Sequence, residues 1–156
     1  MLLEIERKYL VSGLEYLALQ TSCLRLAQGY LCTDPERVVR IRIAGATGTL
    51  TVKGKSSDSG LSRTEIEVEI PPDKAGALMS LCLPGIIEKT RYKVPFGPFI
   101  IEVDVFHGEN EGLVLAEVEL PSEETVFNAP SWFGQEETGD FRYYNAWLSQ
   151  HPYRTW

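Results

Sequence analysis

Histidine and cysteine are scarce in this chain of 156 residues, and their scarcity excludes several kinds of functional site. The only histidines are His107 and His151, so a metal site built from several imidazoles is excluded. The three cysteines, Cys23, Cys32 and Cys82, contain no C-x-x-C pair of the kind that binds zinc or exchanges disulfides. Any metal would therefore be held by carboxylates, which prefer hard ions such as magnesium or manganese.

Long apolar runs and an excess of basic residues are also missing. No stretch approaches the roughly 18 apolar residues that a membrane span requires, and the acidic N-terminus is unlike a secretory signal. We therefore expect a cytoplasmic protein without a membrane partner. The formal net charge of -7 argues against nucleic-acid binding, so any anion site must be local. Because no linker-like segment divides the chain, residues 1–156 are expected to form a single domain.

Two motifs of other enzyme classes are incomplete in this sequence. Gly54-Lys55-Ser56 matches the last three residues of the P-loop motif, but Thr49 stands where the first glycine of that motif would be. No G-x-S-x-G segment is present, which argues against a serine hydrolase. A Walker-type NTPase and a serine hydrolase are therefore set aside.

Charged and branched apolar residues alternate through most of the chain, and this period of two predicts β-strands. Turn signals at Gly45, over residues 54–60 and at Gly97 separate the runs, which indicates hairpins. Strands are expected over residues 4–8, 24–31, 39–43, 49–53, 65–70, 88–95, 99–105 and 117–120. Helices are expected after Val11, over residues 73–82, briefly after Ser122, and over residues 142–150.

The charges on these strands are sorted by sign. Arg40 and Arg42 share one strand face, whereas Glu117 and Glu119 share another. Two such carboxylates lie roughly 6.6 Å apart and repel each other by about 2.5 kcal/mol at an effective dielectric of 20. Clustered acids indicate a cation site and clustered bases an anion site, although each strand alone also fits a sheet with one solvated face. Eight strands closed into a barrel would bring both clusters into one cavity, with the apolar faces outward beneath helices.

The aromatic residues are interpreted mainly as packing residues, because aromatic side chains dominate ordinary burial. Tyr30 is the exception, since its place in the alternation directs its hydroxyl inward, and we keep it as a substrate-binding candidate. The residues expected in the core or on the outside of the barrel are Trp132, Phe133, Tyr143 and Trp147.

Glu4-x-Glu6-x-Lys8 at the N-terminus resembles the E-x-E-x-K signature of the CYTH superfamily, the triphosphate tunnel metalloenzymes. Further matches stand in that family's order along nearly the whole chain. They are Gln28-Gly29-Tyr30, Arg40-Ile41-Arg42, Thr51-Val52-Lys53, Arg63-x-Glu65-x-Glu67, Glu88-Lys89-Thr90-Arg91, Glu102-Val103-Asp104, Glu117-Val118-Glu119 and Asp140-x-Arg142. The chain is most similar to the short bacterial members that hydrolyse inorganic triphosphate.

The resemblance implies an α+β, mainly β fold: an eight-stranded antiparallel closed β-barrel that forms a tunnel, with a few covering helices and a C-terminal helix. It implies phosphate binding by Lys8, Arg40, Arg42, Lys53, Lys89 and Arg91, with Arg63 and Arg142 as helpers. It implies Mg²⁺ or Mn²⁺ bound by Glu4, Glu6, Glu117 and Glu119, with Asp104 as a candidate ligand and Glu65 and Glu67 facing the same cavity. The expected catalytic group comprises Glu4, Glu6, Lys8, Glu117 and Glu119.

The C-terminal segment departs from the family pattern. Phe141 stands where similar short members often carry a lysine, and Tyr144, Ala146 and Trp147 replace a more basic run. The resemblance implies that the helix over residues 142–150 closes one end of the tunnel, and this departure weakens the prediction that the helix supplies phosphate contacts.

The expected function is metal-dependent hydrolysis of inorganic triphosphate to pyrophosphate and phosphate. We identify no segment that could form a nucleobase pocket, which favours inorganic triphosphate over nucleotides. The alternative is a CYTH enzyme that uses a nucleotide or thiamine triphosphate, such as an adenylyl cyclase or a thiamine triphosphatase. A non-catalytic polyphosphate-binding module is disfavoured, because paired acids oppose anion binding without a metal. A homodimer is compatible with the resemblance.

Overall fold

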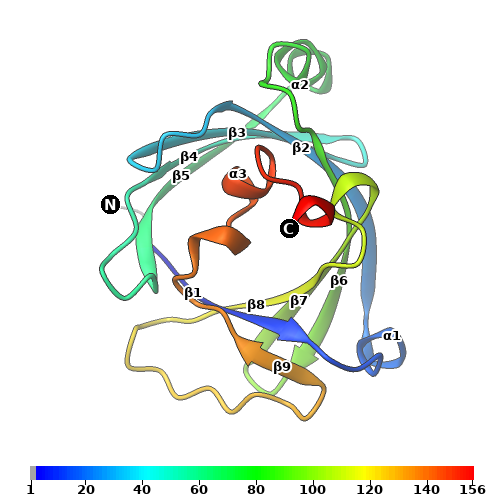
Figure 1. Ribbon diagram of the computed structural model, residues 1–156, viewed down its shortest axis with the longest axis vertical. Helices are drawn as coiled ribbons and strands as arrows, with labels where there is room; N and C mark the ends of the chain where they lie inside the picture. Colours follow the sequence, from blue (N-terminus) through cyan, green and yellow to red (C-terminus); the bar gives the residue numbers. More distant parts are fainter. Residues whose placement is uncertain (1–2) are drawn as a thin grey trace.

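Antiparallel strands close into a barrel in the computed structural model, which describes residues 3–156 (Figure 1). The strands follow the order β5-β4-β3-β2-β6-β7-β8-β1, and β1 then pairs with β5 to close the ring. Their bounds are β1 Leu3–Val11, β2 Ser22–Cys32, β3 Arg37–Ala44, β4 Thr47–Gly54, β5 Ser62–Ile70, β6 Ile87–Phe96, β7 Phe99–Phe106 and β8 Val114–Glu119. The predicted eight-stranded antiparallel barrel is confirmed.

Tight turns join neighbouring strands where the sequence places glycine. The β3–β4 hairpin turns between Ala44 and Thr47, and Gly45 adopts a φ of 60° there. The β6–β7 hairpin turns between Phe96 and Phe99, and Gly97 adopts a φ of 58°. Two-residue hairpin loops need positive φ angles, which glycine adopts without steric cost.

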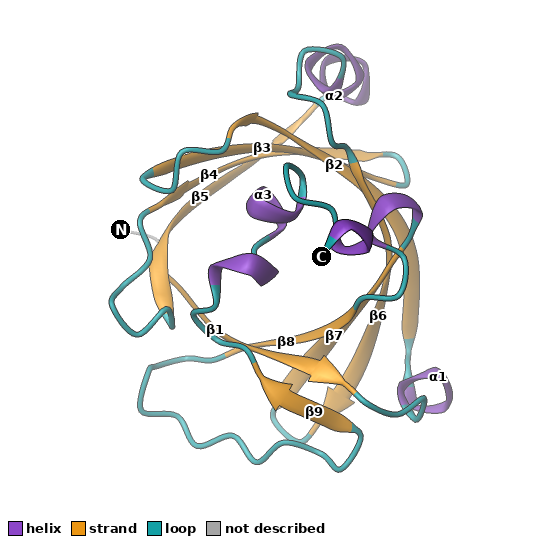
Figure 2. Cartoon of the chain, viewed as in Figure 1, coloured by secondary structure: helices purple, strands orange, loops and turns teal. Residues whose placement is uncertain are grey.

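Two helices lie on the outside of the barrel, as Figure 2 shows. The short α1 (Tyr16–Leu19) follows β1, and α2 (Pro72–Met79) packs against β3 and β4. Ala75 of α2 is fully buried against β4, where Gly48 leaves room for it. A small residue on each side lets helix and sheet approach closely. Across residues 3–156, no helix has the length and apolar character needed to cross a membrane.

The segment after β8 differs from the sequence-based expectation. The helix expected after Ser122 is a single turn, in which the Thr125 amide donates to the Ser122 carbonyl. The chain then continues as a long loop to a short strand that was not predicted, β9 (Phe133–Glu136), which pairs with the end of β1. Two acidic residues, an asparagine and a proline between positions 123 and 130 leave too few apolar residues for an amphipathic helix.

Aromatic residues of this segment cover the outer faces of β1, β7 and β8. Phe127, Trp132 and Phe133 are buried against Tyr9 and the outward valines and isoleucines of these strands. The Tyr9 and Phe133 ring centroids lie 4.8 Å apart, and those of Trp132 and Phe133 also lie 4.8 Å apart. Trp132 and Phe133 therefore cover the barrel as the sequence predicted.

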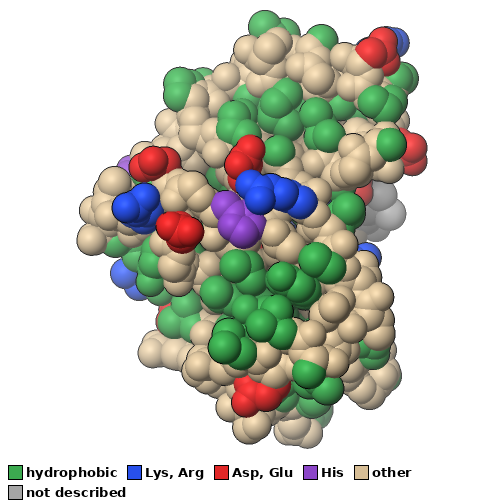
Figure 3. All heavy atoms as spheres, turned by 90° about the vertical axis from the view of Figure 1, so that its right-hand side faces the viewer, with side chains coloured by type: hydrophobic (Ala, Val, Ile, Leu, Met, Phe, Trp, Pro, Cys, Tyr) green, Lys and Arg blue, Asp and Glu red, His purple; other side chains and the backbone are tan. Residues whose placement is uncertain are grey.

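Other outward apolar residues are not covered, contrary to the expectation that helices cover the whole outside. Ile66 and Val68 of β5 expose 52% and 49% of their surface, and Leu24 of β2 exposes 44%. Figure 3 shows hydrophobic side chains gathered on the face that carries β2. Two short helices and one loop cannot cover the circumference of eight strands, so part of the branched apolar surface remains exposed.

The C-terminal segment enters one end of the barrel (Figure 1). It comprises η2 (Phe141–Tyr143), α3 (Asn145–Leu148) and η3 (Tyr153–Thr155), and η1 (Gly108–Asn110) contacts η3 at the rim. The single helix predicted over residues 142–150 is broken because Tyr144 is extended, with φ -74° and ψ 132°. Tyr143 and Leu148 pack with Leu113, which precedes β8, and with inward residues of the strands, namely Tyr30, Val38, Ile87, Phe106 and Leu115. Apolar packing therefore fixes this segment in the barrel.

Candidate functional site

An internal cavity, referred to below as the basic cavity, collects most of the predicted phosphate-binding residues. Its lining includes the acids Glu6 and Glu117, and its volume is about 40 Å³. Because every strand alternates inward and outward, bases from five strands point into the same space. The basic residues that line it are Lys8, Arg40, Arg42, Lys53, Arg63, Lys89 and Arg91, and Tyr30 lies beside them.

Arginines crowd together at one side of the basic cavity. Arg42 of β3 faces Gln28 of β2 in the antiparallel register, and its Nε and one terminal nitrogen donate to Gln28 Oε1 at 3.1 and 3.0 Å. Burial, together with the like charges of Arg40 and Arg91, lowers the pKa of Arg42 to about 10. A bound anion would relieve this repulsion and offset part of the free-energy cost of burying the Arg42 charge.

Arg40 carries a polar group that has no partner. Its side chain is buried, and one terminal nitrogen donates to Thr51 Oγ1 at 3.1 Å. Its Nε is the only buried side-chain nitrogen or oxygen atom without a hydrogen-bond partner within residues 3–156. Because a buried donor without an acceptor destabilises the folded state, Arg40 is prepared to bind an anion.

The C-terminal segment supplies oxygen atoms to the bases. Lys8 Nζ donates to the Tyr143 carbonyl at 3.0 Å. Asn145 Oδ1 accepts hydrogen bonds from Lys89 Nζ at 2.8 Å and from Gln28 Nε2 at 2.9 Å. These oxygens accept hydrogen bonds from nitrogen atoms that would otherwise be free to donate to phosphate oxygens. This part of the segment thus contributes acceptors rather than donors, which agrees with the lack of basic residues over positions 143–150.

Acids of β1 and β8 face one another next to these bases. Glu6 lies opposite Glu119, and Lys8 lies opposite Glu117. Burial and the negative charges of Glu117 and Glu4 raise the pKa of Glu6 to about 8. Burial, Glu4 and Glu102 also raise the pKa of Glu119. Carboxylates whose ionisation is opposed in this way are stabilised by a divalent cation.

Other carboxylates of this group are paired with bases. Burial opposes the ionisation of Glu117, but Lys8, whose Nζ lies 3.6 Å from Glu117 Oε1, outweighs it and the pKa falls to about 2. Glu4 lies 3.1 Å from Lys53 Nζ and 3.8 Å from Arg63 Nε. Within residues 3–156, no three acidic, histidine or cysteine side chains are already arranged to hold a metal ion. Metal binding therefore requires some of these ion pairs to separate.

Asp104, a predicted metal ligand, lies in a buried ion-pair cluster. It accepts hydrogen bonds from Arg91 Nε and a terminal nitrogen at 2.8 and 2.9 Å, and its other contact is Lys89 Nζ at 2.7 Å. Burial opposes its ionisation, but the Arg91 and Lys89 charges outweigh burial and hold its pKa well below the usual range. The bases occupy both carboxylate oxygens, so Asp104 positions Lys89 and Arg91.

Glu65 and Glu67 of β5 lie between the acidic and the basic side chains of the barrel interior. Glu65 Oε2 is 3.9 Å from Lys53 Nζ, and burial together with the neighbouring Glu4 raises the pKa of Glu65 to about 7. Glu67 Oε2 accepts from Thr51 Oγ1 at 3.0 Å. Both side chains lie beside residues of the basic cavity, as the sequence suggested, but neither is among the residues that line it.

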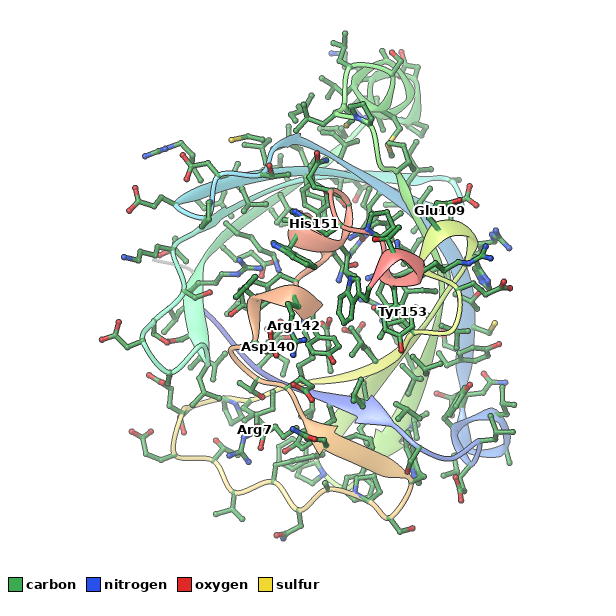
Figure 4. All side chains as sticks on the ribbon, viewed as in Figure 1. Arg7, Glu109, Asp140, Arg142, His151 and Tyr153 are labelled. Atoms are coloured by element: carbon green, nitrogen blue, oxygen red, sulfur yellow. The ribbon has the colours of Figure 1, made fainter. Side chains whose placement is uncertain are left out.

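Arg142 is the predicted phosphate-binding residue that the fold places elsewhere. Its side chain is 48% exposed, is not part of the basic cavity lining, and binds Asp140 with a terminal nitrogen 2.7 Å from Oδ2 (Figure 4). Asn145 and Gln28, by contrast, contact the bases and were not predicted as site residues. Gln28 lies two residues before Tyr30 on the same strand, so the alternation directs both side chains into the barrel. This signal could have identified Gln28 as a site residue.

A family model and several known proteins match nearly the whole length of this chain. The CYTH domain model matches residues 2–145. A protein of Acetivibrio thermocellus named inorganic triphosphatase is 49% identical over 152 residues, which cover 97% of this chain and 96% of the relative. One of Nitrosomonas europaea with the same name is 40% identical over 151 residues, covering 94% and 96%. A crystal structure of an inorganic triphosphatase superposes with a TM-score of 0.65 at 35% identity, covering 94% of this chain and 97% of the other.

Proposed function

Because the chain belongs to the CYTH domain family, we propose that it hydrolyses inorganic triphosphate to pyrophosphate and phosphate with the help of a divalent metal ion. The observation that carries the proposal is the basic cavity, in which Arg40 has an unpartnered Nε and lies in the same barrel interior as the facing acids of β1 and β8. The names of the two full-length relatives support the choice of substrate.

The basic residues are proposed to bind and align the phosphate chain. Lys8, Arg40 and Arg42 donate to phosphate oxygens, and Lys53 and Arg63 do so once they leave Glu4. Their charges stabilise the negative charge that spreads over the transferring phosphoryl group. Asp104 holds Lys89 and Arg91 at the wall of the cavity, and Lys89 donates to a phosphate oxygen once it leaves Asn145 Oδ1.

Magnesium or manganese fits the carboxylates of β1 and β8. Glu4, Glu6, Glu117 and Glu119 offer oxygen ligands, which these hard ions prefer. Burial and the negative charges of Glu117 and Glu4 raise the pKa of Glu6, and a divalent cation would favour its ionised form. When bound, the metal ion supplies electrostatic stabilisation and orients a water molecule for attack in line with the leaving group. Glu4, Glu6, Glu117 and Glu119 would hold the ion, and a carboxylate of this group that does not contact it would accept the proton that the attacking water loses.

The decisive experiment measures phosphate release from triphosphate with magnesium and with manganese. We expect equal amounts of phosphate and pyrophosphate, no turnover after chelation of the metal, and a kcat/KM for triphosphate above that for ATP. No phosphate release with either metal would contradict the proposal. Cyclic AMP as the main product from ATP would indicate a cyclase, and metal-independent polyphosphate binding without turnover would indicate a binding module.

Replacing Arg40 with alanine is expected to lower kcat/KM for triphosphate roughly 10- to 100-fold, because hydrogen bonds to charged groups contribute about 1.5–3 kcal/mol each. Steady-state kinetics at saturating metal would measure the loss. Arg25→Ala is the control, since Arg25 pairs with Glu88 at 3.1 Å on the exposed outer face of β2. If both variants kept wild-type kinetics, Arg40 would not contact the substrate.

A further inference from the structure

Three inward side chains stand side by side on neighbouring strands of the barrel, and the middle one carries no charge. Arg40 of β3 lies directly opposite Thr51 of β4, and Thr51 lies directly opposite Glu67 of β5. Residues directly opposite each other in antiparallel strands project from the same face, so Thr51 lies between a base and an acid. The Thr51 side chain is fully buried. Thr51 is therefore placed to decide how closely Arg40, which lines the basic cavity, approaches Glu67.

The hydroxyl of Thr51 bonds to both neighbours, and the direction of each hydrogen bond is fixed by chemistry. A carboxylate only accepts hydrogen bonds, and a guanidinium only donates them. Thr51 Oγ1 therefore donates its single hydrogen atom to Glu67 Oε2 at 3.0 Å and accepts from a terminal nitrogen of Arg40 at 3.1 Å. That same nitrogen is 3.6 Å from Glu67 Oε2, beyond the roughly 2.7–3.2 Å of a hydrogen bond. The hydroxyl thus holds the guanidinium in place while the two charges stay apart.

Arg91 of β6 shows how an arginine is held when the opposite residue is an acid. It lies directly opposite Asp104 of β7 and donates to both carboxylate oxygens, at 2.8 and 2.9 Å. The Nε of Arg91 is thereby occupied, whereas the Nε of Arg40 has no hydrogen-bond partner among the described residues. The two arginines thus differ in the residue that faces them across the strand pair. A threonine opposite Arg40 leaves one of its donors free for a ligand.

We propose that Thr51 is a positioning residue, which keeps Arg40 free for the triphosphate by preventing a direct ion pair between Arg40 and Glu67. The inference rests on the phosphate site proposed above and adds a residue that acts on the substrate only through Arg40. Without the hydroxyl, the terminal nitrogen of Arg40 has no acceptor, and a buried donor without a partner destabilises the protein. Moving towards Glu67 gives this nitrogen a charged acceptor. Arg40 is then held by a carboxylate, as Arg91 is, and the substrate has to displace that carboxylate before it binds Arg40.

Thr51→Val replaces the hydroxyl with a methyl group and is expected to raise KM for triphosphate roughly tenfold, while kcat stays within about twofold of wild type. The reason is that only the protein molecules in which Arg40 is free bind the substrate fully. Thr51→Ser returns the hydroxyl and should return KM to the wild-type value. Thr49→Val is the matched control with an unchanged KM, because Thr49 lies on the same strand face but opposite Arg42 and Glu69. A wild-type KM in Thr51→Val, or no recovery in Thr51→Ser, would contradict the proposal.

A second change at Glu67 separates competition for Arg40 from a merely structural role of Thr51. Adding Glu67→Gln to Thr51→Val is expected to bring triphosphate binding back to within about threefold of wild type, because a neutral amide holds a guanidinium less strongly than a carboxylate does. Adding Glu69→Gln to Thr51→Val instead removes an exposed negative charge from the same strand and should not restore binding. Titration calorimetry with metal-free protein measures each affinity, so that any metal bound by Glu67 does not contribute. No recovery with Glu67→Gln, or equal recovery with Glu69→Gln, would contradict the proposal.

Folding of the variants and the proposed activity are checked separately. Thr51→Ala removes the same hydroxyl with a smaller side chain and should show the same loss of triphosphate binding, so the result does not depend on how valine packs. Thermal unfolding followed by circular dichroism should show that both Thr51 variants are folded at the assay temperature. Weaker binding that follows a lower content of folded protein in both variants would make Thr51 a structural residue and contradict the proposal. Wild-type protein that binds triphosphate but releases no phosphate would contradict only the proposed function.

Discussion

Replacing Glu119 with glutamine is expected to lower kcat for triphosphate at least roughly 100-fold, the usual cost of removing one group that stabilises charge in a transition state. Glu119 faces Glu6 across the β1–β8 pair, where a divalent ion would be held. Glutamine keeps the shape of the side chain but removes the charge that attracts the metal. The measurement is turnover as a function of magnesium and manganese concentration.

The same variant should fold normally. Burial and the neighbouring acids raise the pKa of Glu119, so its negative charge is unfavourable in the folded protein without metal. A neutral side chain therefore should not lower the melting temperature. Glu111→Gln is a matched control, because Glu111 is an exposed carboxylate near η1 and should keep full turnover. Turnover near that of wild type at low metal concentration in Glu119→Gln would show that Glu119 does not bind the metal.

Replacing Asp104 with asparagine is expected to lower the free energy of unfolding by about 3–5 kcal/mol, the typical cost of removing one partner from a buried ion pair. Asparagine removes the carboxylate that both Lys89 and Arg91 contact, and it leaves Arg91 with Glu102 alone. Lys89 and Asp104 are each only 1% exposed. Urea denaturation at pH 7 would measure the change through a lower midpoint. Glu102→Gln is the matched control, because Glu102 contacts the same Arg91 at 3.3 Å but is 32% exposed.

The pH dependence gives a second check on Asp104. Its pKa is depressed in the folded protein, so its contribution to stability is complete above the unfolded pKa of about 3.9 and declines as pH falls below that value. The stability difference between wild type and Asp104→Asn should therefore shrink as the pH falls below about 3.9. An Asp104→Asn protein of wild-type stability that needs more metal for turnover would instead make Asp104 a metal ligand.

The alternation of residues along the chain was enough to predict the strands and the charges on their faces, and the family resemblance implied that the strands close into a barrel. Charges at every second position place Arg40 with Arg42, and Glu117 with Glu119, on common strand faces whatever the rest of the chain does. Glycines such as Gly97 marked the turns for a similarly local reason. These signals identified the bases of the basic cavity and the carboxylates of β1 and β8, with the family resemblance assigning their roles.

Which charges pair was decided by the register of the strands and by closure of the barrel. Asp104 looked like a metal ligand in the sequence, but the β6–β7 register places it directly opposite Arg91. Arg142 had a suitable charge, but its pairing with Asp140 keeps it out of the basic cavity. A charge that is buried in the barrel without a partner is strongly destabilising, so the fold pairs such charges, and sequence spacing does not reveal which residues pair.

The cavity of about 420 Å³ that lies beside the basic cavity is formed by the tertiary structure alone, and no sequence pattern predicts it. Its walls come from the loop after β4 and from the C-terminal segment, which are about 80 residues apart in the sequence, as Lys55 and Phe141 illustrate. Neither wall has a periodic pattern, because loops and broken helices have none. The local chemistry of the sequence therefore determined the strands and the charges they carry, whereas packing of the C-terminal segment into the barrel decided what space remains beside them.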